Sequence, residues 1–209
     1  MSIPLLRRRT VLSAALLCFA APPIAGRAAD PAVIAPIQRL SDSLLDVMKA
    51  GRGVSFEQRV NQLAPTVDAV FDLSTILQTS IGLAWAQLSA DQHAALLTAF
   101  RRYTIATYVS NFNQFNGQRF EISPDTRALP NNEQMVSSRI IPASGESHQL
   151  DYVMRQGTAG WQAVDVLADG TISRVAVQRS DFRHLLMQGG GATLLASLRR
   201  KSDDLAAGG

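Results

Sequence analysis

Two aspartates in the C-terminal half have the spacing that best suits acid–base chemistry. Asp151 lies in "HQLDYVMR" and Asp165 lies in "WQAVDVL", two runs with the period-two alternation of β-strands. A hairpin with a five-residue loop pairs Arg155 with Trp161 and therefore places Asp151 opposite Asp165. Two carboxylates that face each other repel, so one keeps its proton and the pair can act as general acid and base. This arrangement predicts a small isomerase- or hydrolase-like enzyme.

The same residues also allow a purely structural interpretation. A loop one residue shorter changes the register, and Arg155 or Arg174 can instead form an ion pair with one of the carboxylates. Like charges that are directly opposed destabilise a sheet, which favours one of these alternatives. The sequence leaves the choice between them open.

Other catalytic and metal-binding patterns are missing from the sequence. His93, His148 and His184 are far apart and have no metal-ligand spacing, and Cys18 is the only cysteine. No nucleophile elbow, phosphate loop or dinucleotide fingerprint occurs. We therefore predict neither a metal nor a cofactor.

The elements that must position these residues change type along the chain. Helical spacing of apolar residues covers 34–48, a second helix begins at Ser55 and is interrupted at Pro65, and further helices are expected over 71–81 and from Ser89. After Gly117 the period changes to two, which predicts strands in "RFEI", "QMVSSRII", "HQLDYVMR", "WQAVDVL" and "TISRVAV". Two short helices separated by a glycine triplet, residues 189–191, end the chain. The order predicts an α+β domain in which a helical layer covers a curved four- to five-stranded antiparallel sheet and encloses an apolar cavity.

The helix that begins at Ser89 is apolar on more than one side. Phe100, Tyr103 and Tyr108 belong to one side, whereas Ile105 and Val109 fall on another. Such a helix must be covered twice, either by a sheet and a second helix or by a layer on one side and an apolar ligand on the other. Periodicity does not distinguish these two arrangements.

The N-terminus has the organisation of an export signal. Residues 1–29 contain a basic cluster, an apolar run and small residues before Asp30, and "RRTVLS" approximates a twin-arginine motif, so export by that route or by general secretion to the periplasm is expected. Residues 30–209 are then a single domain. Without the four arginines of the signal, 16 basic residues remain against 17 acidic ones. A nearly neutral chain gives no reason to expect a nucleic-acid partner.

Several motifs together resemble the MlaC family of periplasmic phospholipid-binding shuttles. They are "SIGLAW", "LSADQHAALLTAFRRYTIATY", "FNGQRFEISP", "LDYVMR", "GWQAVDVLADGTIS" and "LLASLRRKSDDL". The resemblance implies a lipid carrier without cofactor or chemistry, with acyl chains in a deep cavity and partners in an inner-membrane ATP-driven lipid transporter and an outer-membrane lipoprotein complex. The signal and "RRYTIATYVSNFNQF" are similar to a hopanoid-associated branch, so the lipid expected is a phospholipid or a hopanoid-type polycyclic lipid. The resemblance also implies that Asp165 is structural and anchors the following turn through Gly170.

Twelve residues are expected to contact the lipid, although ordinary core packing explains each of them as well. They are Leu83, Trp85, Leu97, Phe100, Tyr103 and Thr104 from the helices and Val153, Trp161, Val164, Val166, Ile172 and Val175 from the strands. Besides the carrier, the sequence leaves open the enzyme based on Asp151 and Asp165 and a periplasmic adaptor without ligand.

Overall fold

The computed structural model describes residues 30–208, and the export signal predicted for residues 1–29 lies outside this range. Four helices come first: α1 (Pro31–Ala50), α2 (Phe56–Val70), α3 (Leu73–Ile81) and α4 (Ala90–Asn111). The strands β1 (Arg119–Ala128), β2 (Gln134–Ile141), β3 (His148–Gly157), β4 (Gly160–Ala168) and β5 (Ile172–Ser173) follow, and α5 (Arg174–Ala207) ends the chain. Short 3-10 turns occupy Gly51–Gly53, Gly82–Gln87 and Pro130–Asn132.

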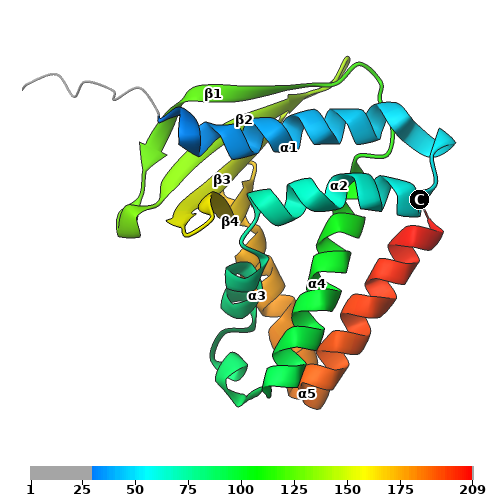
Figure 1. Ribbon diagram of the computed structural model, residues 1–209, viewed down its shortest axis with the longest axis vertical. Coiled ribbons are helices and arrows are strands. Elements are labelled where there is room, and N and C mark those ends of the chain that lie inside the picture. Colours follow the sequence, from blue (N-terminus) through cyan, green and yellow to red (C-terminus); the bar gives the residue numbers. More distant parts are fainter. Residues whose placement is uncertain (1–29, 209) are drawn as a thin grey trace, which may run out of the picture.

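The five strands form one antiparallel sheet in the order β1-β2-β3-β4-β5. In Figure 1, α1 lies across the sheet and α2 lies next to α1. Helices α3, α4 and α5 extend away from the sheet as a second group. Contacts of α1 with β1, β2 and β4, and of α5 with β4, connect the helices to the strands. This arrangement confirms the predicted α+β class, with all five expected strands present.

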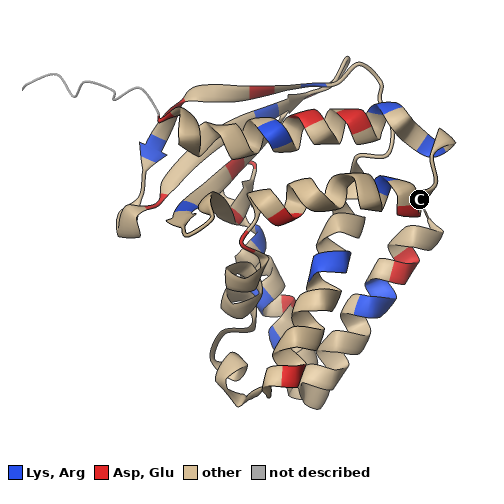
Figure 2. Ribbon diagram, in the orientation of Figure 1, with Lys and Arg blue, Asp and Glu red and all other residues tan. Residues whose placement is uncertain are grey.

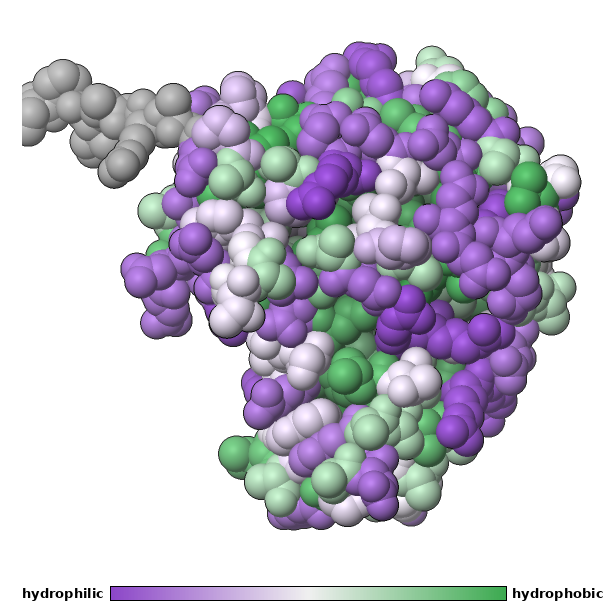
Figure 3. All heavy atoms as spheres, in the orientation of Figure 1, coloured by the Kyte–Doolittle hydropathy of each residue, from purple (hydrophilic) through white to green (hydrophobic). Residues whose placement is uncertain are grey.

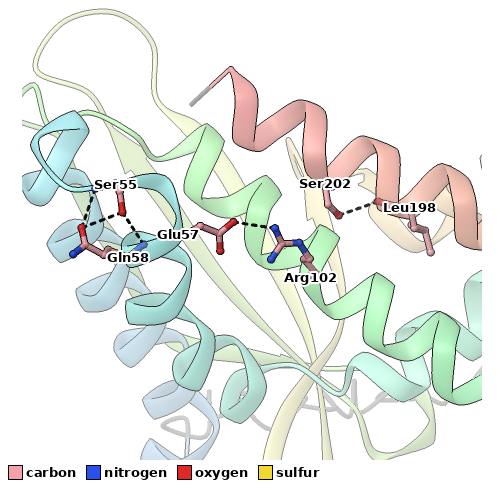
Figure 4. Close-up of polar contacts among 6 residues, drawn as sticks. All are labelled: Ser55, Glu57, Gln58, Arg102, Leu198 and Ser202. Atoms are coloured by element: carbon pink, nitrogen blue, oxygen red, sulfur yellow. Dashed lines mark hydrogen bonds and ion pairs between the residues drawn. The ribbon is translucent and has the colours of Figure 1, made fainter.

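Side-chain caps determine where α2 and α4 begin. Ser55 accepts a hydrogen bond from the Gln58 amide and Gln58 accepts one from the Ser55 amide, and Ser89 and Gln92 repeat the pattern. Each box satisfies two amides that have no partner within the helix, which confirms both predicted helix starts. The first box is visible in Figure 4.

The predicted interruption of the second helix at Pro65 is wrong. Helix α2 continues through Pro65 to Val70. Proline removes one backbone hydrogen bond, but Pro65 and Asn61, whose carbonyl loses its partner, are both exposed, so water can satisfy that carbonyl.

Helices α2 and α4 form the closed part of the core. Leu63 and Val67 of α2 and Ile105 and Val109 of α4 have no solvent exposure. At the surface, Arg102 of α4 donates to Glu57 of α2 at 2.9 Å (Figure 4).

A buried arginine also joins these two helices. Arg59 is 1% exposed and donates to the carbonyls of Val54 and Val109. Val109 lies in the last turn of α4, where a cation is favourable because the helix carbonyls point toward it. Burial and the nearby charge of Arg52 lower the pKa of Arg59, yet a guanidinium remains charged at neutral pH.

The β3–β4 hairpin does not have the predicted five-residue loop. Gly157 pairs with Gly160, so the turn contains two residues, and a bulge lies between Val153 and Met154 in the pairing with β4. Asp151 consequently faces Leu167, and Asp165 faces Val153. The structure therefore contradicts the predicted opposition of Asp151 and Asp165.

The segment after β4 also differs from the prediction. Only Ile172 and Ser173 of "TISRVAV" form a strand, and Val175 lies in the first turn of α5. Ser173 caps this helix by accepting from the Ala176 amide, which explains why the strand stops there. Farther along, Gly189 and Gly190 leave helical geometry and kink α5, as the glycine triplet predicts.

The outer surface is mixed in charge and mostly hydrophilic. Figure 2 shows both acidic and basic residues on α1 and on α5, whereas α3 has no charged residue. In Figure 3, hydrophobic residues form limited patches between larger hydrophilic areas. No helix among residues 30–208 combines the length and the apolar character needed to cross a membrane.

Candidate binding cavity

A cavity of about 490 Å³ lies between α3, α4, the start of α5 and the strands β2, β3 and β4. Most of its walls are hydrocarbon. The lining residues are Phe71, Leu73, Ile76, Phe100, Tyr103, Thr104, Thr107, Tyr108, Asn111, Phe112, Ile140, His148, Leu150, Asp165, Val166, Arg174, Val175 and Gln178.

The interior end of the cavity is built from buried apolar side chains. Leu73 and Ile76 of α3, Phe100 of α4 and Val175 of α5 are each at most 8% exposed. The ring of Phe100 also meets Phe182 edge to face at 6.2 Å, which holds α4 against α5 behind the cavity. These contacts make a firm apolar wall.

Two threonines of α4 leave the space between the aromatic residues open. Thr104 and Thr107 are short side chains at positions where a leucine or phenylalanine would extend farther into the cavity. The Thr107 hydroxyl donates to the Tyr103 carbonyl, but the buried Oγ1 of Thr104 has no hydrogen-bond partner among residues 30–208. A buried hydroxyl without a partner destabilises the folded state, so the hydroxyl of Thr104 lowers the stability of the domain.

Tyr108 lines the same space in a strongly apolar environment. Its ring lies 5.6 Å from the ring of Phe71 and 6.1 Å from that of Phe112. Burial raises the pKa of Tyr108 well above its ordinary value, Tyr152 raises it further, and the positive charge of Arg174 lowers it. The side chain of Tyr108 is partly exposed because its ring borders the cavity. Its other neighbours are protein side chains.

Asp165 holds the start of α5 rather than presenting a free carboxylate. Its Oδ1 accepts from the amides of Val166 at 2.7 Å and Val175 at 3.1 Å, and its Oδ2 accepts from the Ser173 hydroxyl. These bonds connect β4 to the first turn of the helix. The role is structural, as the family resemblance implies, but the partners are Ser173 and Val175 rather than the turn at Gly170.

Asp151 lies in a different environment. It is 4% exposed, does not line the cavity, and accepts from the Gln149 side-chain amide at 3.1 and 3.0 Å. A Cβ added to Gly170 would lie 3.5 Å from its Oδ2, so Gly170 is the glycine next to Asp151. The two aspartates do not form an acid–base pair.

Five of the twelve residues predicted to contact a ligand line the cavity. They are Phe100, Tyr103 and Thr104 of α4, Val166 of β4 and Val175 of α5. Helix α4 therefore lines the cavity as expected, whereas fewer of the residues predicted from the strands do so.

Three of the remaining residues lie outside the cavity on the helical side. Leu83 is 95% exposed, because the left-handed Gly82 ends α3 and turns the chain outward. The indole of Trp85 stacks on His93 at 3.8 Å between ring centres, and Leu97 packs against the core.

The last four lie elsewhere on or beside the sheet. Val153 follows Tyr152 on β3, so the two side chains point to opposite faces of the sheet. Val164 of β4 is the extra residue at the bulge in the pairing with β3. Trp161 packs against the core at the turn end of the hairpin, and Ile172 is 52% exposed on the edge strand.

The sequence reasoning did not select the residues of α3 and the preceding Phe71. Leu73 and Ile76 share the apolar side that was recognised for 71–81, so their periodicity was informative, but nothing local shows that this side borders a cavity. The exposed polar lining residues Asn111, His148 and Arg174 were also missed as a group, since they are distant in sequence.

The arrangement defines an α+β ligand-binding domain with an apolar cavity between a sheet and helices. Among residues 30–208, no three histidine, cysteine, aspartate or glutamate side chains lie close enough to hold a metal ion. The model of the family described as "MlaC protein" matches residues 38–200, and the chain belongs to the MlaC family.

The fold has been observed in solved structures, of which seven chains match. One is the phospholipid-binding protein from Ralstonia solanacearum in complex with a phospholipid. Its TM-score is 0.72 at 21% identity, and the match covers 83% of this chain and 98% of that chain. No curated protein matches the sequence.

Proposed function

We propose that this protein is a periplasmic lipid carrier that holds the apolar part of a phospholipid or hopanoid-type lipid in the cavity. The observation that carries the proposal is an apolar cavity of about 490 Å³ in a member of the MlaC family. Its volume lies within the range of roughly 300–1,000 Å³ that is usual for ligand sites. The Ralstonia protein, described as binding a phospholipid, supports the same function through the shared fold.

A carrier of this kind overcomes the cost of exposing hydrocarbon to water. Transfer of one CH₂ group into water costs about 0.8 kcal/mol, so a lipid with two long chains faces roughly 20 kcal/mol or more without help. The buried walls formed by α3, α4 and α5 replace the contacts that the chains lose when they leave a bilayer. The function needs binding and release, and no catalytic residue.

The finer points of the proposal come from the family resemblance and the N-terminal sequence. Residues 1–29 direct export to the periplasm and are then removed, leaving 30–209 as the working domain. Lipid is exchanged between an inner-membrane ATP-driven transporter and an outer-membrane lipoprotein complex. The separation of Asp151 and Asp165 in the β3–β4 register favours a carrier over the enzyme alternative.

The test is to measure lipid in the purified mature protein by organic extraction and mass spectrometry. The expected result is near-stoichiometric lipid. Thr107→Trp places an indole inside the cavity and should lower the lipid content at least several-fold, because the ring takes space that the lipid chains need.

Thr98→Trp is the matched control. Thr98 lies on the exposed side of the same helix and, like Thr107, donates its hydroxyl to the carbonyl four residues earlier. Lipid content should be normal in this variant. Protein that is consistently empty supports the adaptor alternative, and equal lipid in both variants places the lipid outside this cavity.

A further inference from the structure

The two most exposed large apolar side chains among residues 30–208 lie at the end of the molecule farthest from the sheet. Leu83 is 95% exposed and Met187 is 78% exposed, whereas every other large apolar side chain is at most 52% exposed. Leu83 belongs to the 3-10 turn between α3 and α4, and Met187 lies two residues before the kink of α5. Figure 1 shows this turn and the bend of α5 at the same end. We call this end, together with the first turn of α4, the distal tip.

The distal tip carries little charge. Residues 73–90 contain no acidic or basic residue, and residues 184–198 contain none apart from His184. The charged residues that flank these segments near the tip are two of each sign, Asp91 of α4 and Arg179, Asp181 and Arg183 of α5. The tip therefore has no net charge, and its exposed apolar side chains can leave water without the desolvation of a charge.

The backbone that presents Leu83 is held on both sides. Before the turn, Arg179 of α5 donates to the carbonyl of Thr79 at 3.2 Å. Within the turn, the indole of Trp85 stacks on His93 at 3.8 Å, and Nε2 of His93 donates to the Trp85 carbonyl at 2.9 Å. A fixed backbone therefore holds the Leu83 side chain outward, although neighbouring residues of the same turn pack against the protein.

The small area of the tip favours a lipid bilayer over a protein partner. Burial of two large side chains removes on the order of 200 Å² of apolar surface from water. A stable protein interface, including one with a second copy of this chain, needs about 800 Å² on each partner. A bilayer surface requires no matching shape, and tryptophan, here Trp85 beside Leu83, is typical of the interface between lipid and water.

We propose that the distal tip docks reversibly on the surface of a lipid bilayer, with Leu83 and Met187 inserted among the lipids. Binding is weak because only two large apolar side chains insert, so the protein can leave the membrane again. No residue of the tip lines the cavity, and docking therefore leaves the cavity unoccupied by the membrane. The inference goes beyond the proposed carrier function and does not depend on it.

The test is flotation of the mature protein with phosphatidylcholine vesicles at millimolar lipid. The unmodified protein should rise with the vesicles, and to the same extent when they contain phosphatidylglycerol or when salt is high, because the tip has no net charge. Leu83→Ser should lower the partition coefficient roughly tenfold, the ratio expected when one large apolar side chain no longer inserts. Met187→Ser should lower it severalfold, and Leu83→Phe should retain binding.

Ile172→Ser is the matched control. Ile172 is also an exposed apolar residue, at 52%, but it lies on β5 in the sheet, so this variant should float like the unmodified protein. Extraction of cavity lipid from each variant separates docking from carrying. Normal lipid content without flotation of the unmodified protein overturns the docking inference alone, whereas flotation of protein that contains no lipid supports docking and contradicts the carrier function.

A fluorophore at a single position tests which surface meets the membrane. The only cysteine, Cys18, lies in the predicted signal, so one introduced cysteine can be labelled specifically in the mature protein. A polarity-sensitive label on Ala86→Cys, which is exposed in the tip, should shift its emission to the blue when vesicles are added. The same label on Ser144→Cys, in the exposed loop between β2 and β3, should not.

Four outcomes overturn the proposal. They are a blue shift at Ser144→Cys without one at Ala86→Cys, flotation that requires phosphatidylglycerol and disappears at high salt, flotation of Leu83→Ser equal to that of the unmodified protein, and a concentration-dependent dimer that Leu83→Ser abolishes. The last outcome identifies a second copy as the partner of the tip, and sedimentation without vesicles measures it.

Discussion

Two sides of helix α4 meet apolar surroundings in different ways. The core side, formed by Ala99, Ile105, Ala106 and Val109, is buried, and its α2-facing part meets fully buried residues such as Leu63 and Val67. The cavity side, formed by Phe100, Tyr103, Thr104, Thr107, Tyr108 and Asn111, borders open space. Close packing stabilises the first side, whereas the second keeps volume for a ligand and gives up part of that stability.

Adjacent residues show what separates the two sides. Ile105 has no exposure and touches other core residues, while Thr104, one position earlier, has a buried hydroxyl without a partner. A rotation of about 100° per residue is enough to move a side chain from the core to the cavity. Apolar character alone therefore does not identify a binding site. Whether a side of the helix borders a filled core or a cavity depends on the residues that other elements place against it.

The largest expected effect is on the core side. Ile105→Ala should lower the free energy of unfolding by about 2–5 kcal/mol, because it leaves a void among close-packed side chains. Urea unfolding of the lipid-free protein measures this change. Thr104→Ala is the neighbouring control and should change stability by less than about 1 kcal/mol. Similar losses in both variants contradict the distinction between the two sides.

A smaller effect, confined to high pH, is expected from the buried phenols. Burial raises the pKa values of Tyr108 and Tyr152, so the folded state keeps protons that the unfolded chain loses above its ordinary tyrosine pKa of about 10. Stability is then unaffected below that pH and falls as pH rises beyond it. Tyr108→Phe should move the midpoint of alkaline unfolding, followed by circular dichroism, to higher pH. An unchanged midpoint argues against a dry environment at Tyr108.

The smallest effect has the opposite sign. Thr104→Val replaces the hydroxyl that has no partner with a methyl group of nearly the same size, so the lipid-free protein should gain roughly 1 kcal/mol. Thermal unfolding without lipid measures the gain. A loss of stability would mean that the hydroxyl is hydrogen-bonded to water in the empty cavity.

Local sequence patterns were sufficient for most of the elements. Ser55 with Gln58 and Ser89 with Gln92 mark helix starts through bonds to residues three positions away, and the alternation in "QMVSSRII" coincides with β2. The α+β class and the MlaC resemblance follow from the order of these patterns, and the family match supports both. Such signals depend on neighbours in the chain.

The register of the β3–β4 hairpin and the membership of the cavity depended on the tertiary structure. A two-residue turn and one bulge set a register in which Asp151 and Asp165 do not pair. The glycine-containing loop sequence does not specify either feature uniquely. The exposed polar lining residues Asn111, His148 and Arg174 come from three different elements, α4, β3 and α5. The sequence determined that α4 has apolar residues on two sides, because helical periodicity is a local property. Which side meets a filled core and which meets an open cavity was decided by the volumes of side chains brought in from α2, α3, α5 and the sheet.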